Sequence, residues 1–215
     1  MNQPFKMRPN LLEWRLISLD RRPERRAAFT KGMPFDESKR ILSAVEGSTI
    51  TDPEGRTDLA GAFGCFASHI ALYKEAIFEG RKFLAVFEDD AQPTPLFTNK
   101  KKLMFDQAAF LPWDFLHLGR PSQEQREGSI EVIGTEWSIP AGGIVNSHAY
   151  IINEDMMQFM VNHFAPEGKE APYGPPYHFD RAINIALAIG NFGVYYPTRR
   201  AMFRQDKSLE TDIRW

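Results

Sequence analysis

Apolar residues along the chain form two kinds of pattern, short continuous runs and runs spaced for one face of a helix. The short runs predict strands at Leu16–Leu19, Ile41–Val45, Phe83–Phe87, Phe115–Leu118, Ala149–Ile152 and Phe192–Tyr196. The helical spacing and the proline and glycine signals predict helices at Pro23–Lys31, Phe66–Phe78, Glu154–Phe164 and Asp180–Ile189. Strands that alternate with helices predict an α/β fold with a mostly parallel sheet flanked by helices.

Three polar or Pro/Gly-rich stretches interrupt this pattern, at Ile50–Asp58, Pro121–Gly143 and Ala165–Tyr177. We expect Pro121–Gly143 to be a long loop with a short strand or two, and loops of that length often close over a substrate. The chain shows no internal repeat, low-complexity tract or strong boundary. With 215 residues, it is expected to form a single domain over residues 1–215.

Composition and charge narrow the class of protein. Hydrophobic residues make up 43% and charged residues 25%, which excludes a disordered or collagen-like chain. The 26 basic and 28 acidic residues give a net charge of −2, so we expect no nucleic-acid partner. Any phosphate binding must then come from a local cluster of basic residues.

The sequence also bears on location. Cys65 is the single cysteine, so no intramolecular disulfide can form, which fits a reducing compartment. No apolar run approaches the roughly 20 residues of a membrane span, and Met1–Asn10 lacks the apolar stretch of a secretory signal. We therefore expect a cytoplasmic protein whose membrane contact, if any, is peripheral, at the inner membrane.

The sharpest candidate for chemistry is the acidic triplet Glu88-Asp89-Asp90, directly after the predicted strand Phe83–Phe87. Ligands of open α/β sheets bind at the carboxyl ends of strands. Adjacent carboxylates repel one another, and a hard divalent ion such as Mg²⁺ or Mn²⁺ would offset that repulsion while holding substrate phosphates. A solvated acidic turn explains the triplet equally well from spacing alone.

A second cluster is the arginine-rich turn Asp20–Arg26, between the first predicted strand and helix. Arginines at a helix N-terminus can hold a diphosphate through charge-assisted hydrogen bonds. Taken alone, the turn is better explained as a solvated helix face that Asp20 and Glu24 partly neutralise.

Two further segments are ambiguous from spacing. Gly61–His69 predicts only a turn followed by a helix, and Ser68 and His69, as helix neighbours, point apart and cannot form a nucleophile–base pair. Cys65 within it is interpreted as a packing residue. His178-Phe179-Asp180 precedes a predicted helix, where Asp180 suits an N-cap better than a general base or, with His178, a metal site.

Taken in order, these segments resemble glycosyltransferase family 25, which includes bacterial lipooligosaccharide galactosyltransferases and collagen galactosyltransferases. The matching segments are Ile17–Arg25, the Gly-x-x-Gly-Cys-x-x-Ser-His segment Gly61–His69, Glu88-Asp89-Asp90, Trp113–Gly119, Ala149–Ile152, Gln205 and Thr211-Asp212-Ile213. The resemblance covers about residues 14 to 213, and Ser18 and Thr211 depart from the family's usual Asn and Ser. Pro121–Gly143 and Ala165–Tyr177, where acceptor choice would be expected, are hard to align. The identity of the acceptor is therefore the property that carries over least from the family.

The resemblance implies a single-domain, A-type glycosyltransferase fold and transfer of a hexose, galactose or glucose favoured, from a UDP-sugar with inversion. It implies a glycan, a lipid-linked glycan or a protein as acceptor, as in lipopolysaccharide biosynthesis. A divalent ion, Mn²⁺ or Mg²⁺, would stabilise the leaving diphosphate as a Lewis acid.

The same resemblance, with the chemistry above, assigns roles to residues. The expected metal ligands are Asp90, Glu88 and His178. The candidate bases that deprotonate the acceptor hydroxyl are Asp180 and, behind it, Asp114. The residues expected to bind the donor are Ser18, Asp20, Arg21, Arg25, Ser68, His69, Glu88, Asp89 and Gln205.

Two other classes of function stay open. One is a carbohydrate- or nucleotide-binding module that keeps the fold without transfer, and the other is a metal-dependent phosphoryl hydrolase that uses the same acidic strand end. Release of intact nucleoside diphosphate from a nucleotide sugar distinguishes transfer from both, because a module releases nothing and a hydrolase of this kind releases sugar 1-phosphate.

Overall fold

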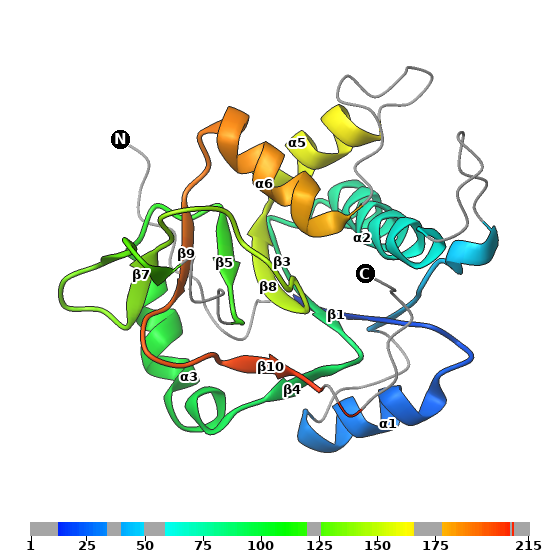
Figure 1. Cartoon of the computed structure of the whole chain (residues 1–215), viewed down its shortest axis with the longest axis horizontal. Coiled ribbons are helices and arrows are strands. Elements are labelled where there is room, and N and C mark those ends of the chain that lie inside the picture. The colour runs from blue at the N-terminus through cyan, green and yellow to red at the C-terminus, as the bar shows by residue number, and fades with distance from the viewer. Residues whose placement is uncertain are drawn as a thin grey trace.

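A computed structural model of the chain describes residues 13–33, 40–49, 59–119, 126–165, 178–206 and 208. An eight-stranded sheet lies at its centre, in the order β2-β1-β3-β8-β5-β9-β7-β6 (Figure 1). These strands are β1 (Glu13–Ser18), β2 (Ile41–Ser43), β3 (Phe83–Glu88), β5 (Phe115–His117), β6 (Ile130–Glu131), β7 (Trp137–Ile139), β8 (Ala149–Asn153) and β9 (Val194–Pro197). A two-stranded antiparallel sheet pairs β4 (Ala91–Pro93) with β10 (Phe203–Gln205).

The sheet is mostly parallel, as the alternation of elements predicts. β1 pairs in parallel with β2 and β3, and β5 with β9. β8 is antiparallel to both β3 and β5, so β3 and β5 run in the same direction. Only β8 and β7 run against the rest of this sheet. The carboxyl ends of β1 and β3 therefore meet at one edge.

Helices cover both faces of the sheet (Figure 1). They are α1 (Pro23–Gly32), α2 (Ala60–Phe78), α3 (Pro95–Ala108), α5 (Glu154–Phe164) and α6 (Phe179–Gly190), with a short 3-10 turn, η3 (Gly47–Thr49). Helices α2, α5 and α6 lie on one face, and α1 and α3 lie on the other with the β4–β10 sheet. The α/β class expected from the sequence is confirmed.

The central strand β3 supplies side chains to a separate core on each face. Ala85 and Phe87 pack with the side chains of α1 and α3, while Leu84 and Val86 pack with those of α2, α5 and α6. This alternation follows from the two-residue period of a strand. It explains why Phe83–Phe87 is continuously apolar, since both of its faces are buried.

The boundaries of α5 agree with the sequence pattern, whereas those of two other helices do not. Asn153 caps α5 by accepting a hydrogen bond from the Met156 amide at 3.0 Å, and the helix spans the predicted residues. The predicted start of α2 at Phe66 was wrong, because the helix begins at Ala60 and includes both glycines of the segment. The pattern also failed to predict α3, whose buried residues are interrupted by a run of lysines.

The described part of Pro121–Gly143 contains β6 and β7, which extend the sheet beyond β9. The expectation of a loop with short strands is confirmed, but these residues form an edge hairpin and line neither of the cavities described below. Ile50–Asp58, residues 121–125 and 166–177, and Thr211-Asp212-Ile213 lie outside the described residues. No helix in the described part of the chain is long and apolar enough to cross a membrane.

Candidate functional site

A cavity of about 260 Å³ opens at the edge where β1 and β3 end. Most of the residues predicted to bind the donor or metal line it, although they come from five separate segments. Those lining it are Ser18, Arg21, Arg25, Ser68, His69, Glu88, Asp89, Asp90 and Gln205. Asp20 does not line it, and its exposed carboxylate instead accepts hydrogen bonds from Arg26 and Ser43.

Asp89 connects three elements beneath the cavity. Its carboxylate is buried and accepts a hydrogen bond from Ser18 Oγ at 2.8 Å and one from Arg25 Nη1 at 3.2 Å. These contacts tie the end of β1 and the first turns of α1 to the end of β3. Both carboxylate oxygens have partners, so Asp89 orients Ser18 and Arg25 at the cavity wall.

Asp90, the next residue, has a different environment. One carboxylate oxygen accepts a hydrogen bond from Gln205 Nε2 at 2.9 Å, while Oδ1 is buried without a partner among the described residues. Burial, and then the charge of Glu88, raise the pKa of Asp90 to about 6. A buried oxygen without a partner in a cavity wall is available to a ligand or cation.

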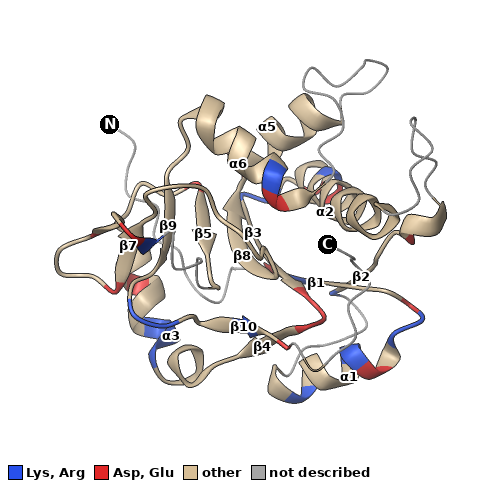
Figure 2. Cartoon of the chain, viewed as in Figure 1, with Lys and Arg blue, Asp and Glu red and all other residues tan. Residues whose placement is uncertain are grey.

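Glu88 lies at the end of β3, between the cavity and the core. Burial raises its pKa to about 8, and the charges of Asp180 and Asp89 add to this effect. Its Oε1 lies 3.4 Å from His69 Nε2. A positive ion beside Glu88 and Asp90 would favour their charged forms. Figure 2 shows the acidic turn that leads from β3 into β4, with basic residues on the neighbouring helix α1.

His69 is fixed by a chain of buried hydrogen bonds. Its Nδ1 lies 2.6 Å from the Tyr150 hydroxyl, which lies 2.7 Å from the Tyr73 hydroxyl. The imidazole stacks on Phe179 with ring centroids 3.8 Å apart. Burial lowers the pKa of His69 to about 3, so the ring is neutral at physiological pH. The sequence offered no signal for Tyr73 or Phe179 beyond their apolar spacing.

Two glycines explain how α2 reaches the site. A Cβ on Gly64 would lie 2.6 Å from the Val45 carbonyl oxygen, and one on Gly47 would overlap the Ala60 carbonyl. The helix and the loop after β2 therefore approach closely. Ser68 Oγ joins them, since it donates to the Gly64 carbonyl at 2.7 Å and accepts from the Val45 amide at 2.8 Å.

The arginine-rich turn contributes at two depths. Arg25 is buried beside the cavity and pairs with Asp89 at 3.2 Å. Arg21 is half exposed and pairs with Glu46 at 3.0 Å. Glu46, on the loop after β2, also lines the cavity, and the sequence patterns did not single it out. The turn thus supplies two cavity-lining arginines, one buried and one half exposed, while Asp20 pairs with Arg26 on the surface as spacing alone favoured.

A second cavity of about 50 Å³ is also lined by Glu88. It shares Cys65, Glu88 and Gln205 with the larger cavity, and His178 and Asp180 line it. The Asp180 carboxylate accepts hydrogen bonds from the Asn146 amide at 2.7 Å and from the amide and hydroxyl of Ser147. Asp180 therefore holds the loop before β8, where Asn146 has a φ of 60°.

Asp114, the other candidate base, is not brought to either cavity. It precedes β5 and so lies at the amino end of that strand, on the edge of the sheet opposite to Glu88. Its carboxylate accepts hydrogen bonds from Asn153 Nδ2 and the Gly193 amide, both at 2.7 Å. This arrangement gives Asp114 a connecting role between β5, β8 and the segment before β9.

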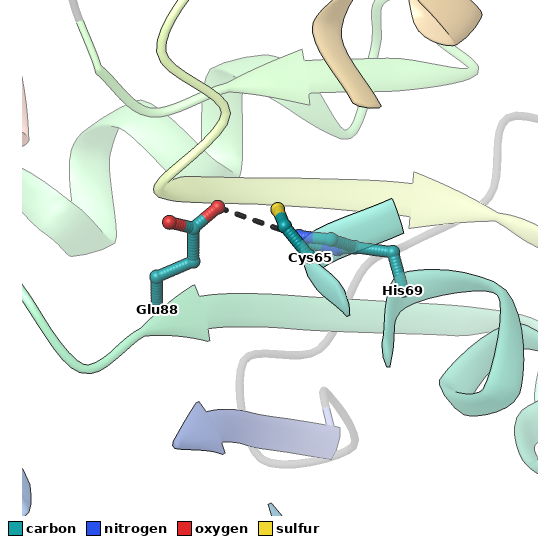
Figure 3. A group of neighbouring side chains, drawn as sticks. All are labelled: Cys65, His69 and Glu88. Carbon is teal, nitrogen blue, oxygen red and sulfur yellow. Dashed lines mark hydrogen bonds and ion pairs between the residues drawn. The ribbon is translucent and has the colours of Figure 1, made fainter. Parts of the chain in front are cut away.

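Cys65 was interpreted from sequence as packing, yet it lines both cavities. Its ligand atom and those of His69 and Glu88 lie within 4.8 Å of one another. Figure 3 shows the three side chains converging from α2 and β3. The four-residue spacing of Cys65 and His69 on one helix face was the available signal.

A protein-family model matches the part of the chain that contains most of the segments described above. The family model described as "Glycosyltransferase family 25 (LPS biosynthesis protein)" matches residues 12–171, which excludes His178, Asp180 and Gln205. Procollagen galactosyltransferase 2 of Homo sapiens is 28% identical over 180 residues, 73% of this chain and 28% of its own length. A Bos taurus protein named "Probable inactive glycosyltransferase 25 family member 3" is 30% identical over 158 residues, 64% of this chain and 26% of its own length.

The chain spans only about a quarter of the length of these curated relatives. Among solved structures, a glycosyltransferase involved in glycosylation of the major capsid of PBCV-1 aligns with 93% of this chain and 94% of its own. That alignment has a TM-score of 0.45 and 7% identity, too low to carry an argument about function.

Proposed function

The chain belongs to glycosyltransferase family 25, and from that premise we propose that it transfers a hexose from a UDP-sugar to an acceptor hydroxyl. Galactose is favoured because a relative is named a procollagen galactosyltransferase. The acceptor would be a glycan, a lipid-linked glycan or a protein. Residues 1–215 would form one glycosyltransferase domain with an A-type fold.

The observation that carries this proposal is the convergence of the family-like segments on the larger cavity. Segments that are separated by up to 187 positions, from Ser18 to Gln205, line one space at the carboxyl edge of the sheet. Arg25 supplies a buried positive charge for a diphosphate, and Asp89 fixes its position. The cavity volume of about 260 Å³ suits part of a nucleotide sugar, and ligand-binding sites of α/β sheets are common at the carboxyl edge.

The carboxylates at the cavity wall also fit a hard divalent ion. Asp90 Oδ1 has no partner among the described side chains, and Glu88 offers a second carboxylate at the same wall. Asp90 and Glu88 would hold Mn²⁺ or Mg²⁺, and His178 lies at the smaller cavity next to Glu88. Such an ion supplies Lewis-acid stabilisation of the leaving diphosphate.

The smaller cavity is our candidate for the acceptor hydroxyl. It shares Glu88 and Gln205 with the donor cavity, so a group bound there would lie next to the donor sugar. Asp180 lines it and is the proposed base, which takes the hydroxyl proton as the oxygen attacks the anomeric carbon. Attack from the side opposite to the leaving diphosphate inverts that carbon.

A non-catalytic binding module is the second candidate function. Some relatives of this chain carry names that mark them as inactive glycosyltransferases. In addition, the Asp180 carboxylate already accepts three hydrogen bonds in the structure, which suits a residue that only holds a loop. The triplet at β3 is intact in this chain, and this favours transfer.

The test is a screen of nucleotide sugars with Mn²⁺, read by released nucleoside diphosphate, with and without candidate acceptors. We expect UDP from UDP-galactose or UDP-glucose, and much less from the Asp90→Asn variant. Binding without release in every combination would establish the module instead. Release of sugar 1-phosphate would indicate the hydrolase.

A further inference from the structure

The group formed by Cys65, His69 and Glu88 brings a sulfur, a nitrogen and an oxygen ligand together, and the proposed function uses only Glu88 of the three as a metal ligand. Cys65 and His69 are four residues apart on α2 and share a helix face, while Glu88 comes from the end of β3. Their ligand atoms all lie within 4.8 Å of one another. In Figure 3, the Cys65 sulfur lies beside the line that joins His69 and Glu88.

The orientation of His69 is the second observation. Its Nδ1 faces the Tyr150 hydroxyl at 2.6 Å, and Tyr150 can in turn donate to Tyr73. With the proton on Nδ1, the lone pair of Nε2 points toward Glu88, 3.4 Å away. Histidines that bind metals usually donate their other ring N–H to a polar group in this manner.

We propose that Cys65, His69 and Glu88 form a binding site for a thiophilic divalent cation such as Zn²⁺, separate in chemistry from the hard ion at Asp90. One sulfur, one imidazole nitrogen and one carboxylate oxygen form the mixed ligand set of zinc sites, whereas Mg²⁺ takes oxygen ligands.

The spacing of the ligand atoms requires little movement. Tetrahedral ligands at about 2.0–2.3 Å from zinc lie about 3.3–3.8 Å from one another. A limit of 4.8 Å in the structure therefore leaves a closing movement of about 1 Å, which side-chain rotation can supply. Three protein ligands would leave one tetrahedral position for water or another ligand, and Cys65 and Glu88 line both cavities. Burial, and then the charges of Glu88, Asp180 and Asp90, raise the pKa of the Cys65 thiol, so the cation must displace a thiol proton. On binding, the thiol releases its proton to solvent.

This site would control the proposed transferase, and this part of the inference depends on the proposed function. Glu88 belongs to both ligand sets, so a thiophilic ion held at Cys65 withdraws Glu88 from the hard ion. Low concentrations of Zn²⁺ should then inhibit transfer at saturating Mn²⁺, and the Cys65→Ser variant should resist that inhibition.

Cobalt binding to the full chain, with no nucleotide or sugar present, tests the site directly. Because Cys65 is the single cysteine, a thiolate-to-cobalt charge-transfer band can come only from this residue. We expect the band to saturate near one equivalent of Co²⁺, to disappear on addition of Zn²⁺, and to be absent from Cys65→Ser. Glu88→Gln should bind Co²⁺ at least about tenfold more weakly, by loss of a charged ligand worth more than 1.4 kcal/mol.

His163→Gln is the matched control, since His163 lies on α5 against Phe159 and outside the group. Its cobalt titration should equal that of the wild type. The absence of a band in the wild type would overturn the proposal, and so would an unchanged affinity in Glu88→Gln. These outcomes do not depend on catalysis, so a chain that binds Co²⁺ through sulfur but transfers no sugar contradicts only the proposed function.

Discussion

Two edges of the same sheet carry carboxylates in opposite situations. At the amino end of β5, both oxygens of Asp114 accept hydrogen bonds at 2.7 Å from groups of the protein. At the carboxyl end of β3, Asp90 Oδ1 is buried with no partner in the described part of the chain, and Glu88 faces other carboxylates. A carboxylate that joins segments has its oxygens occupied, whereas one arranged for a ligand keeps an oxygen available at an electrostatic cost.

The largest effect is expected from Asp90→Asn. The substitution keeps the size of the side chain and an acceptor for Gln205, but removes the charge proposed to hold the hard ion. UDP release should fall by about 10²–10³-fold, as for the loss of one electrostatic contact to a transition state. The free energy of unfolding should not fall, because a repulsive buried charge is lost. Full activity with Mn²⁺ present would contradict the metal assignment.

Asp180→Asn sharpens the comparison, because Asp180 lies at a cavity although its carboxylate is occupied. If it is the base, turnover should fall by about 10²-fold or more. Ser147→Ala is the matched control, since it removes one hydrogen bond to Asp180 and leaves the carboxylate. We expect it to change turnover by less than about threefold, within the roughly 1 kcal/mol of such a bond. Equal losses in the two variants would mean that Asp180 only holds the loop.

Asp114→Asn should show the reverse behaviour of Asp90→Asn. The amide cannot accept from both Asn153 and the Gly193 amide, so a buried donor loses its partner. Denaturant unfolding should show a loss of about 1–3 kcal/mol in the free energy of unfolding. Turnover per folded molecule should stay within about twofold of the wild type, a change of less than about 0.5 kcal/mol in the activation free energy, because Asp114 lines neither cavity. A large loss of turnover with unchanged stability would return Asp114 to the list of bases.

The pH dependence of stability gives a smaller signal. Glu88 has its pKa raised from 4.5 to about 8, so the folded state holds a proton that the unfolded state has released. Stability should therefore fall as the pH rises from about 6.5 to 8.5, by about 1–2 kcal/mol in metal-free buffer. The buried histidines, whose pKa values are lowered, act mainly below that range. Glu88→Gln should lose the slope and Asp114→Asn should keep it, as measured by denaturant unfolding at each pH.

Gln205→Ala should have the smallest effect. It removes the hydrogen bond that Asp90 Oδ2 accepts at 2.9 Å, a contact that lowers the pKa of Asp90. We expect a loss of stability below about 1 kcal/mol and a severalfold higher Mn²⁺ requirement for UDP release. An Mn²⁺ requirement equal to that of the wild type would remove Gln205 from the site.

The sequence predicted the edge of the sheet that carries the cavity, because strand ends can be located from local patterns. The apolar run before Glu88 and the polar turn after Leu19 each identify a strand end within a few residues. Partners are set by tertiary contacts, and these could not be predicted. Nothing local shows that Asp89 binds Ser18 and Arg25 while Asp90 keeps an oxygen available.

The same limit explains what was missed. The sequence left Asp114 as a second candidate base behind Asp180, and only the direction of β5 places Asp114 at the far edge. The glycines in α2 suggested a turn, whereas both lie within the helix and Gly64 allows the close approach of Val45 and Gly47. Cys65 has the spacing of a ligand beside His69, but Glu88 joins the pair only through the packing of α2 on β3.

The most direct test of the central claim is calorimetric titration of UDP into the wild type, Asp90→Asn and Asp114→Asn, each with and without Mn²⁺. If the carboxyl edge of β3 is the donor site, the wild type and Asp114→Asn should bind UDP more tightly with Mn²⁺. Asp90→Asn should bind at least about tenfold more weakly under the same conditions, a difference of 1.4 kcal/mol or more. Equal affinities in Asp90→Asn and the wild type, with no effect of Mn²⁺ on either, would contradict the claim.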